Sequence, residues 1–296
     1  MLPAELESLA ARHVPGSGTL AIHRLRHGLV NETYRVLRDG CAYALRVAAA
    51  NAYDFGLDRA WEARVLESAV LGGLAPALEY CDPVRGIVIA RWVDGRSWSA
   101  VDVRQQSNIS RMAELLRRIH GLPMATPTRF VSPTKWIDYY SAAVPAAAAN
   151  LRTAAAQRLA ALTALPGVDP VVCHSDLHAL NLIDCGHSLV LLDWEYAHAS
   201  DPLWDLAGWS ANNDLEDDLR HELLASYAGR APTRNEWLRL QLLGWLYDYV
   251  CLLWSELYLN LYRDAPDGAV RQDADAAEDG VAARSRLLAE RLHASK

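Results

Sequence analysis

The stretch that decides the fold reads His174-Ser175-Asp176-Leu177-His178-Ala179-Leu180-Asn181, followed twelve residues later by Asp193-Trp194-Glu195. It forms an H-x-D-x4-N loop ahead of an apolar strand, Leu189 to Leu192, that ends at a carboxylate. Kinase-type phosphoryl transfer uses these parts in this order. The pattern therefore predicts an enzyme that moves a phosphoryl group.

The asparagine that ends the loop and the aspartate that follows the strand, Asn181 and Asp193, suit a magnesium ion. Magnesium prefers oxygen ligands and neutralises the negative charge of nucleotide phosphates. We expect the carboxylate of Asp193 and the amide oxygen of Asn181 to hold it. The sequence thus predicts magnesium as a cofactor.

The histidine and the aspartate of the H-x-D part, His174 and Asp176, suit the acceptor side of the reaction. An acceptor hydroxyl must be oriented toward the phosphorus and must lose its proton as the new bond forms. Asp176 is the predicted carboxylate for this step. His174 is expected to brace the loop by hydrogen bonding rather than to react.

Two other interpretations of the same stretch stay open at this point. His174, Asp176 and His178 could form the H-x-D-x-H metal cluster of a hydrolase, because alternate residues of an extended segment point the same way. Acidic residues after an apolar strand can also simply cap the next element. The hydrolase interpretation is weaker, because the chain has no second His-rich cluster to complete a metal shell.

The whole block resembles the aminoglycoside phosphotransferase and choline kinase superfamily. Within it, the stretches 191–197 and 201–207, which read LLDWEYA and DPLWDLA, resemble the choline kinase-like and thiamine kinase-like branches. This resemblance implies ATP as the phosphoryl donor and an α+β, bilobal, protein-kinase-like fold. We expect a small β-sheet lobe over residues 1–94 and a larger helical lobe over residues 95–296, since Val93-Asp94-Gly95 punctuates the chain.

The first ninety residues have strand character broken by turns, which predicts a β-meander. In the family such a hairpin lies over the nucleotide phosphates, and Gly28 and Asn31 match its motif. His27 stands where the motif has its first glycine. Arg46, on the predicted strand 43–47, matches the cation that contacts the α- and β-phosphates, and choline kinases resemble this chain in using Arg there. Arginine keeps the charge of the usual lysine and adds a bidentate fork.

A helix is predicted from about Asp58, whose side chain can cap its first turn. The kinase pattern requires a glutamate on this helix to hold the strand cation. Glu62, in an R-x-x-E spacing, is the better match, and Glu67 also qualifies. The resemblance further implies that adenine bonds to the backbone between Ala90 and Trp92.

Beyond residue 95 the sequence reads as helix apart from the catalytic loop. In the helix expected over residues 233–262, apolar residues from Trp237 to Tyr258 recur at alternating three- and four-residue spacing and predict a buried stripe. A neighbouring face brings aromatic rings close to carboxylates, a combination that binds a cation. The predicted acceptor-binding residues are Trp245, Asp248, Tyr249, Glu256 and Glu195.

The composition narrows the possible partners and the compartment. The net charge of −7, from 29 basic and 36 acidic residues, argues against nucleic acid as a partner. The chain has no uncharged apolar run of membrane-spanning length, and its N-terminus lacks the pattern of a signal peptide, so we expect a cytoplasmic protein without a membrane partner. Five dispersed cysteines suggest neither zinc nor a disulfide framework. The oligomeric state cannot be read from the sequence.

The sequence therefore predicts an ATP-dependent phosphotransferase with an alcohol group as acceptor. The expected acceptor is a small cationic alcohol of the choline, thiamine or ethanolamine type. An aminoglycoside or sugar kinase of the same fold ranks second, and a catalytically silent kinase-like binding protein is the alternative from another class. The choice between ATP and GTP stays open.

Overall fold

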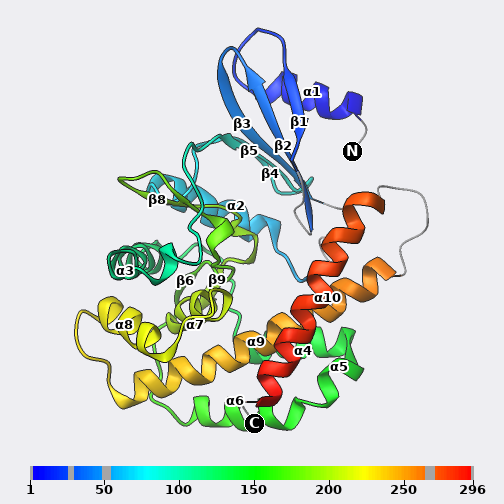
Figure 1. Ribbon diagram of the computed structural model, residues 1–296. Helices are drawn as coiled ribbons and strands as arrows, with labels where there is room; N and C mark the ends of the chain where they lie inside the picture. The colour runs from blue at the N-terminus through cyan, green and yellow to red at the C-terminus, as the bar shows by residue number, and fades with distance from the viewer. Residues whose placement is uncertain (1–2, 26–29, 49–54, 264–270, 295–296) are drawn as a thin grey trace. The chain divides into compact units, whose positions relative to one another are not determined.

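The computed structural model describes residues 3–25, 30–48, 55–263 and 271–294 (Figure 1). The chain divides into two compact units. Unit 1 comprises Met1–Trp98 and Leu180–Ala197, and unit 2 comprises Ser99–Ala179 and His198–Lys296. The predicted catalytic loop is therefore shared, with its first part in unit 2 and its last part in unit 1. The predicted lobes 1–94 and 95–296 remain a prediction.

Unit 1 is built on a five-stranded antiparallel sheet with the order β1-β2-β3-β5-β4. Its strands are β1 (Ala21–Arg24), β2 (Asn31–Arg38), β3 (Cys41–Ala48), β4 (Leu78–Asp82) and β5 (Ile87–Arg91). The first three strands follow one another as a meander, as the sequence predicts. Arg46 thus lies on β3, the middle strand of the sheet, rather than on an edge.

The two faces of the sheet have different contents. Along β3, Tyr43, Leu45 and Val47 are buried, while the residues between them are half-buried, because successive side chains of a strand point to opposite faces. The buried face packs with apolar residues of and just after helix α1 (Pro3–His13), namely Leu6, Leu9, Ala10 and Val14. Arg46 therefore points away from this core, into the opposite face.

Helix α2 (Arg59–Leu71) begins where the sequence predicts it. The side chain of Asp58 accepts a hydrogen bond from the backbone N–H of Trp61 at 2.9 Å, which satisfies one of the otherwise unpaired donors of the first turn. The helix buries Glu62 on the same side as its apolar residues. A buried carboxylate needs a charged partner, and α2 is placed to offer one to the sheet.

Unit 1 also contains the segment that follows the predicted catalytic loop. It runs through the short 3-10 helix η3 (Ala179–Asn181), the antiparallel pair β7 (Leu182–Asp184) and β8 (Leu189–Leu191), and the 3-10 helix η4 (Trp194–Tyr196). Residues Asn181 and Asp193 flank this hairpin on its open end. The pairing of the two strands therefore brings the ends of the segment together.

Unit 2 is mainly helical (Figure 1). Its helices are η2 (Asp102–Arg104), α3 (Gln106–His120), α4 (Pro133–Ala143), α5 (Pro145–Ala149), α6 (Arg152–Thr163), α7 (Leu203–Asn212), α8 (Asp217–Ala228), α9 (Arg234–Arg263) and α10 (Arg271–Ala294). The strands β6 (Val171–Cys173) and β9 (His198–Ser200) pair with each other beside the catalytic loop. Within the described part of the chain, no helix is both long and apolar enough to cross a membrane.

The long helix expected over residues 233–262 is present as α9, but its burial extends beyond the predicted stripe. Leu240, Tyr247 and Tyr258 of the stripe are buried, whereas Trp237 is only half-buried. The helix packs against α4, α7 and α10, so side chains on several of its faces are enclosed. The alanine-rich segment is interrupted at Pro145, where α5 starts, since proline cannot donate the hydrogen bond that would continue α4.

The packing of α7 on α9 predicts opposite effects for two glycine substitutions. A Cβ atom at Gly208 of α7 would lie 2.7 Å from Cε2 of the buried Tyr247 ring, whereas a Cβ at Gly244 of α9 meets no other atom within 4 Å. Gly208→Ala should therefore cost about 1–3 kcal/mol of unfolding free energy through overpacking. Gly244→Ala should be neutral or stabilise by up to about 1 kcal/mol through helix propensity.

Urea unfolding of both variants, followed by circular dichroism, measures the two effects. Equal stability of the two variants would contradict the close approach of α7 to α9.

Candidate active site

The β7–β8 hairpin brings the two predicted magnesium ligands together. Leu182 pairs with Leu191, and the carbonyl oxygen of Asn181 accepts a hydrogen bond from the backbone N–H of Leu192 at 2.8 Å. Asp193, the next residue, has a left-handed backbone with φ 61° and ψ 64°. Such a conformation is uncommon outside glycine and recurs at functional sites. Asp193 keeps 34% of its side-chain surface exposed.

The donor chemistry of this pair fits magnesium. A carboxylate and an amide side chain both offer the oxygen atoms that this ion prefers. The two residues flank one short antiparallel pair, and the bond from Leu192 to the Asn181 carbonyl fixes their backbones relative to each other.

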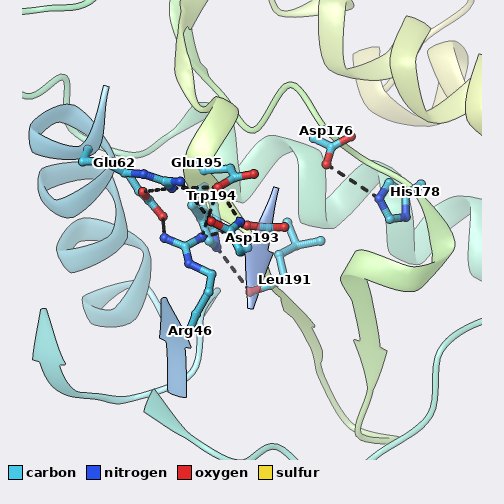
Figure 2. A network of polar contacts seen from close by, with 10 residues as sticks. Arg46, Glu62, Asp176, His178, Leu191, Asp193, Trp194 and Glu195 are labelled. Atoms are coloured by element: carbon cyan, nitrogen blue, oxygen red, sulfur yellow. Dashed lines mark hydrogen bonds and ion pairs between the residues drawn. The ribbon is translucent and has the colours of Figure 1, made fainter. Parts of the chain in front are cut away.

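Arg46 connects the sheet, α2 and the segment 193–195, called the metal segment because it carries the predicted magnesium ligand Asp193, within unit 1 (Figure 2). Its Nη1 atom donates to Asp193 Oδ1 at 2.8 Å and lies 3.6 Å from Glu195 Oε2. Its Nη2 atom donates to Glu62 of α2. Arg46 keeps only 14% of its side-chain surface exposed, so its charge depends on these carboxylates rather than on water. The predicted strand cation and its predicted helix partner are thus in direct contact.

A second arginine extends the network to β2. Arg59 Nη1 donates to Glu62 Oε2 at 2.8 Å and to Glu195 Oε2 at 2.7 Å, and its Nη2 donates to Asn31 Oδ1 at 3.0 Å. Asn31 in turn donates to Glu195 Oε2 at 2.7 Å. Asn31, Arg59, Glu62 and Glu195 are all buried. Glu195, which the sequence analysis assigns to the acceptor, therefore lies in this network of unit 1.

The buried charged groups of the network shift one another's pKa values. Burial opposes the charged form of Arg46, but the neighbouring carboxylates of Glu62, Asp193 and Glu195 outweigh it and raise the pKa of the guanidinium. Burial likewise works against the ionised form of Glu62, yet Arg46 and Arg59 bring the pKa of its carboxyl below the usual value. Burial, followed by the negative charge of Asp193, raises the pKa of Glu195 to about 7. Three carboxylates thus compete for two guanidinium groups.

In unit 2, the first part of the predicted catalytic loop is fixed by a buried acid on α7. Asp205 accepts hydrogen bonds from the backbone N–H groups of His174 at 2.8 Å and Ser175 at 2.7 Å. Burial raises the pKa of Asp205. The bond to His120 and the backbone donors lower it by more, so the pKa of Asp205 lies below its usual value. Ser175 has a φ of 70°, an uncommon left-handed conformation that these contacts hold in place.

His174 has the contacts of a brace. It is fully buried, and its Nδ1 atom accepts a hydrogen bond from the backbone N–H of Asp176 at 3.3 Å. The neighbouring Ser175 hydroxyl lies 3.0 Å from Nδ1 of His198 on β9. The loop therefore presents Asp176 from a backbone that is held on its N-terminal side.

Asp176 remains partly open to solvent, with 31% of its side-chain surface exposed. Its Oδ2 atom lies 3.6 Å from His178 Nε2, longer than a hydrogen bond, so His178 acts on it through charge when protonated. Burial raises the pKa of Asp176, and His178, His174 and Arg284 together lower it below the usual value. Asp176 is therefore ionised at neutral pH.

The four predicted acceptor residues of α9 already have partners inside unit 2. The Arg158 guanidinium lies over the Trp245 ring, 4.1 Å from its centroid, and Arg291 of α10 donates to Asp248. Glu256 accepts a hydrogen bond from Ser285 of α10 at 2.5 Å. Tyr249 is buried beside Trp245, with ring centroids 5.5 Å apart.

Burial of Asp248, partly offset by Arg291, raises the pKa of its carboxyl to about 6. Both predicted acids and the predicted indole thus already contact groups of the protein itself.

The remaining predicted nucleotide contacts lie in unit 1. Gly28 falls outside the described residues. Ala90 stands opposite Ala44 of β3 and Leu78 of β4, and the backbone N–H of Trp92 donates to the carbonyl of Ala42 at 3.0 Å. The adenine contact near these two residues remains a prediction.

The sequence pattern of the phosphotransferase enzyme family matches residues 21–243, more than half of the chain. The chain belongs to this family. The prediction of a phosphotransferase is thereby confirmed.

Individual relatives agree with this assignment. Protein LicA of Haemophilus influenzae is 23% identical over 210 residues, which are 69% of this chain and 61% of that protein, so the match spans less than two thirds of LicA. A choline/ethanolamine kinase family protein from Mesorhizobium loti is similar in structure, with a TM-score of 0.74, 27% identity, and coverage of 97% of this chain and 95% of its own.

Choline kinase LicA from Streptococcus pneumoniae has a TM-score of 0.76 and 21% identity, and the match covers 98% of each chain. These similarities confirm the predicted kinase-like α+β fold.

Several residues of the site were not identified from the sequence. Asp205 and Asn212 act through backbone groups of the catalytic loop, Arg59 joins the ion network, and Arg284 comes from the C-terminal helix. For Arg59 the R-x-x-E spacing was a usable signal, since residues three apart on a helix are neighbours. Asp205 lies in the stretch 201–207, which resembles the family, but the motif does not show which groups Asp205 contacts. Arg284 has no local signal at all.

The ion network predicts unequal effects for two glutamates of α2. Glu62 is buried between Arg46 and Arg59, whereas Glu67 is exposed on the same helix. Removing one partner of a buried ion network typically costs 3–5 kcal/mol. Glu62→Gln should therefore lower the unfolding free energy by about 3 kcal/mol.

Glu67→Gln is the matched control and should change the unfolding free energy by less than about 0.5 kcal/mol. Urea unfolding at neutral pH measures both. Similar stabilities for the two variants would mean that Glu62 does not hold the arginines.

Proposed function

We propose that this protein transfers the γ-phosphoryl group of ATP to a hydroxyl of a small molecule, with magnesium, and that the acceptor is a cationic alcohol of the choline, ethanolamine or thiamine type. The observation that carries the first part is the contact of Arg46 with both Glu62 and Asp193. A kinase-type site needs a strand cation, a helix glutamate and a metal-binding aspartate in mutual reach.

The nucleotide side of the reaction is assigned to unit 1. Asp193 and Asn181 would hold magnesium, which neutralises charge on the phosphates when bound. Arg46 would contact the α- and β-phosphates, because its planar fork suits phosphate oxygens. Glu62 keeps that fork charged and oriented. Asn31 is bound through Arg59 and Glu195 to the same network, at the start of β2 and next to the predicted phosphate-covering turn.

The acceptor side is assigned to the loop of unit 2. Asp176, ionised at neutral pH, would accept a hydrogen bond from the acceptor hydroxyl and orient its oxygen. As the oxygen–phosphorus bond forms and ADP departs, the hydroxyl proton passes to the Asp176 carboxylate. A carboxylate with a low pKa holds this proton weakly. Asp176 would therefore mainly orient the acceptor hydroxyl, and it would take the proton only when the oxygen–phosphorus bond is nearly formed.

The class of the acceptor is supported by the relatives. Two proteins of similar structure are named as a choline/ethanolamine kinase family protein and as choline kinase LicA. Aromatic rings bind such cations by their quadrupole. Because Trp245 and Asp248 already contact Arg158 and Arg291, a cationic acceptor that uses them would have to replace an arginine.

Replacing the predicted acceptor-side carboxylate tests the reaction itself. Asp176→Asn keeps the shape of the side chain but removes its ability to take a proton, so turnover should fall by roughly 10²-fold or more, while the Michaelis constant for ATP stays nearly constant. Asp169→Asn, at an exposed loop position of the same unit, is the control and should behave like the parent protein. Coupled measurement of ADP release reads both. Near-parental turnover in Asp176→Asn would exclude this role.

The acceptor class is tested with a pair of isosteric alcohols. Choline and its carbon isostere, in which a tert-butyl group replaces the trimethylammonium group, differ in charge but hardly in shape. If the site recognises a cation, kcat/KM should be higher for choline by up to ~30-fold, equivalent to about 2 kcal/mol of cation–π attraction. Trp245→Leu should reduce this ratio and leave the Michaelis constant for ATP unchanged. Equal kcat/KM values for the two alcohols would favour a sugar or aminoglycoside as acceptor.

A further inference from the structure

A chain of hydrogen bonds runs from the C-terminal helix to the catalytic loop within unit 2. The Arg284 Nη2 atom of α10 donates to Asn212 Oδ1 at 2.6 Å. The Asn212 side-chain amide, at the end of α7, donates to the carbonyl oxygen of Leu177 at 2.9 Å and to the Tyr247 hydroxyl at 2.9 Å. Leu177 is the residue directly after Asp176. Three helices thus converge on one backbone carbonyl of the loop.

This carbonyl is the part of the loop that the other anchors do not hold. Asp205 binds the backbone N–H groups of His174 and Ser175, and His174 binds that of Asp176. All of these contacts fix the peptide on the N-terminal side of Asp176. The Asn212 bond fixes its C-terminal side, so the direction of the Asp176 side chain depends on both.

Arg284 also acts on Asp176 through its charge. It lies on α10, and its positive charge contributes, after His178 and His174, to lowering the pKa of Asp176. Burial opposes the charge of Arg284, while Cys251, Tyr247 and Asp176 raise the pKa of the guanidinium. Arg284 is therefore charged at neutral pH. The titratable or charged groups that interact with Asp176 are His174, His178, Arg284, Tyr140, Tyr247 and Cys251.

We propose that Arg284 and Asn212 are positioning residues for Asp176, so that α10 sets the orientation of the acceptor-side carboxylate. Arg284 orients the Asn212 amide, and the amide holds the peptide that follows Asp176. A misplacement of a reacting group by about 1 Å can cost roughly 10²-fold in rate. The proposal rests on the assignment of Asp176 to the acceptor.

The experiment compares three substitutions with a matched control. Arg284→Met removes the charge and the bond to Asn212, and Arg284→Lys restores the charge without the fork. Asn212→Asp keeps an oxygen for Arg284 but removes the amide donor to Leu177. Arg286→Met removes the same charge from an exposed position two residues further along α10 and serves as the control. Each protein is assayed for kcat, for the Michaelis constant of ATP, and for the pH dependence of kcat.

The positioning role predicts a specific pattern. Arg284→Met and Asn212→Asp should each lower kcat by roughly tenfold to 10²-fold, with the Michaelis constant for ATP unchanged. Arg284→Lys should recover part of the loss. In Arg284→Met the acid limb of the kcat profile should move to higher pH, because a positive charge that lowers the pKa of Asp176 is gone. Arg286→Met should match the parent in every measurement.

Two results would overturn the proposal. One is parental kcat in Arg284→Met and Asn212→Asp while Asp176→Asn is impaired. The other is a fall in kcat that follows a loss of thermal stability and leaves the acid limb in place, since this indicates a purely structural role. Parental kcat in Asp176→Asn would instead refute the proposed function, so the two failures are distinguishable.

Discussion

The burial of the Arg46 guanidinium is the constraint on which the rest of unit 1 depends. A charge removed from water must be paired, and Arg46 finds its partners on two segments: Glu62 on α2, and Asp193 and Glu195 at the start of η4. Because each partner is itself buried or half-buried, none can move without leaving a charge uncompensated. The sheet, the helix and the metal segment are therefore fixed to one another by electrostatics as well as by apolar packing.

The same network contains a third carboxylate, that of Glu195. Arg46 alone could neutralise Glu62 but not Asp193 as well. Arg59 supplies the second positive charge, and Glu195 joins it to Asn31 on β2. With Asp193 included, the cluster carries three acids against two arginines, and burial together with the negative charge of Asp193 raises the pKa of Glu195. A surplus of negative charge next to Asp193 is suited to a divalent cation, and this is consistent with the magnesium role proposed for that residue.

Local signals in the sequence were sufficient for much of the fold. The meander of β1 to β3, the start of α2 at Asp58 and the long helix α9 follow from turn residues, a cap and helical spacing, all of which act within a few residues of the chain. The contact of Arg46 with Glu62 was predicted through family resemblance. The bond from Glu195 to Asn31 was not, because it joins residues 164 positions apart and is decided by packing rather than by local pattern.

The acceptor side shows why sequence reasoning is weakest there. The pattern of α9 gave Trp245 and Asp248 as neighbours on a helix face, and they are, but a pattern on one helix cannot state what packs against it. Helix α10 supplies Arg291 to Asp248 and Arg284 to Asn212, and α6 supplies Arg158 to Trp245. Arg291 and Arg158 bring positive charge to a face of α9 on which the sequence shows rings and acids. In the proposed acceptor site, recognition would depend on charges contributed by several helices, and the preference for a cation would be set by how readily Arg158 and Arg291 give up their partners.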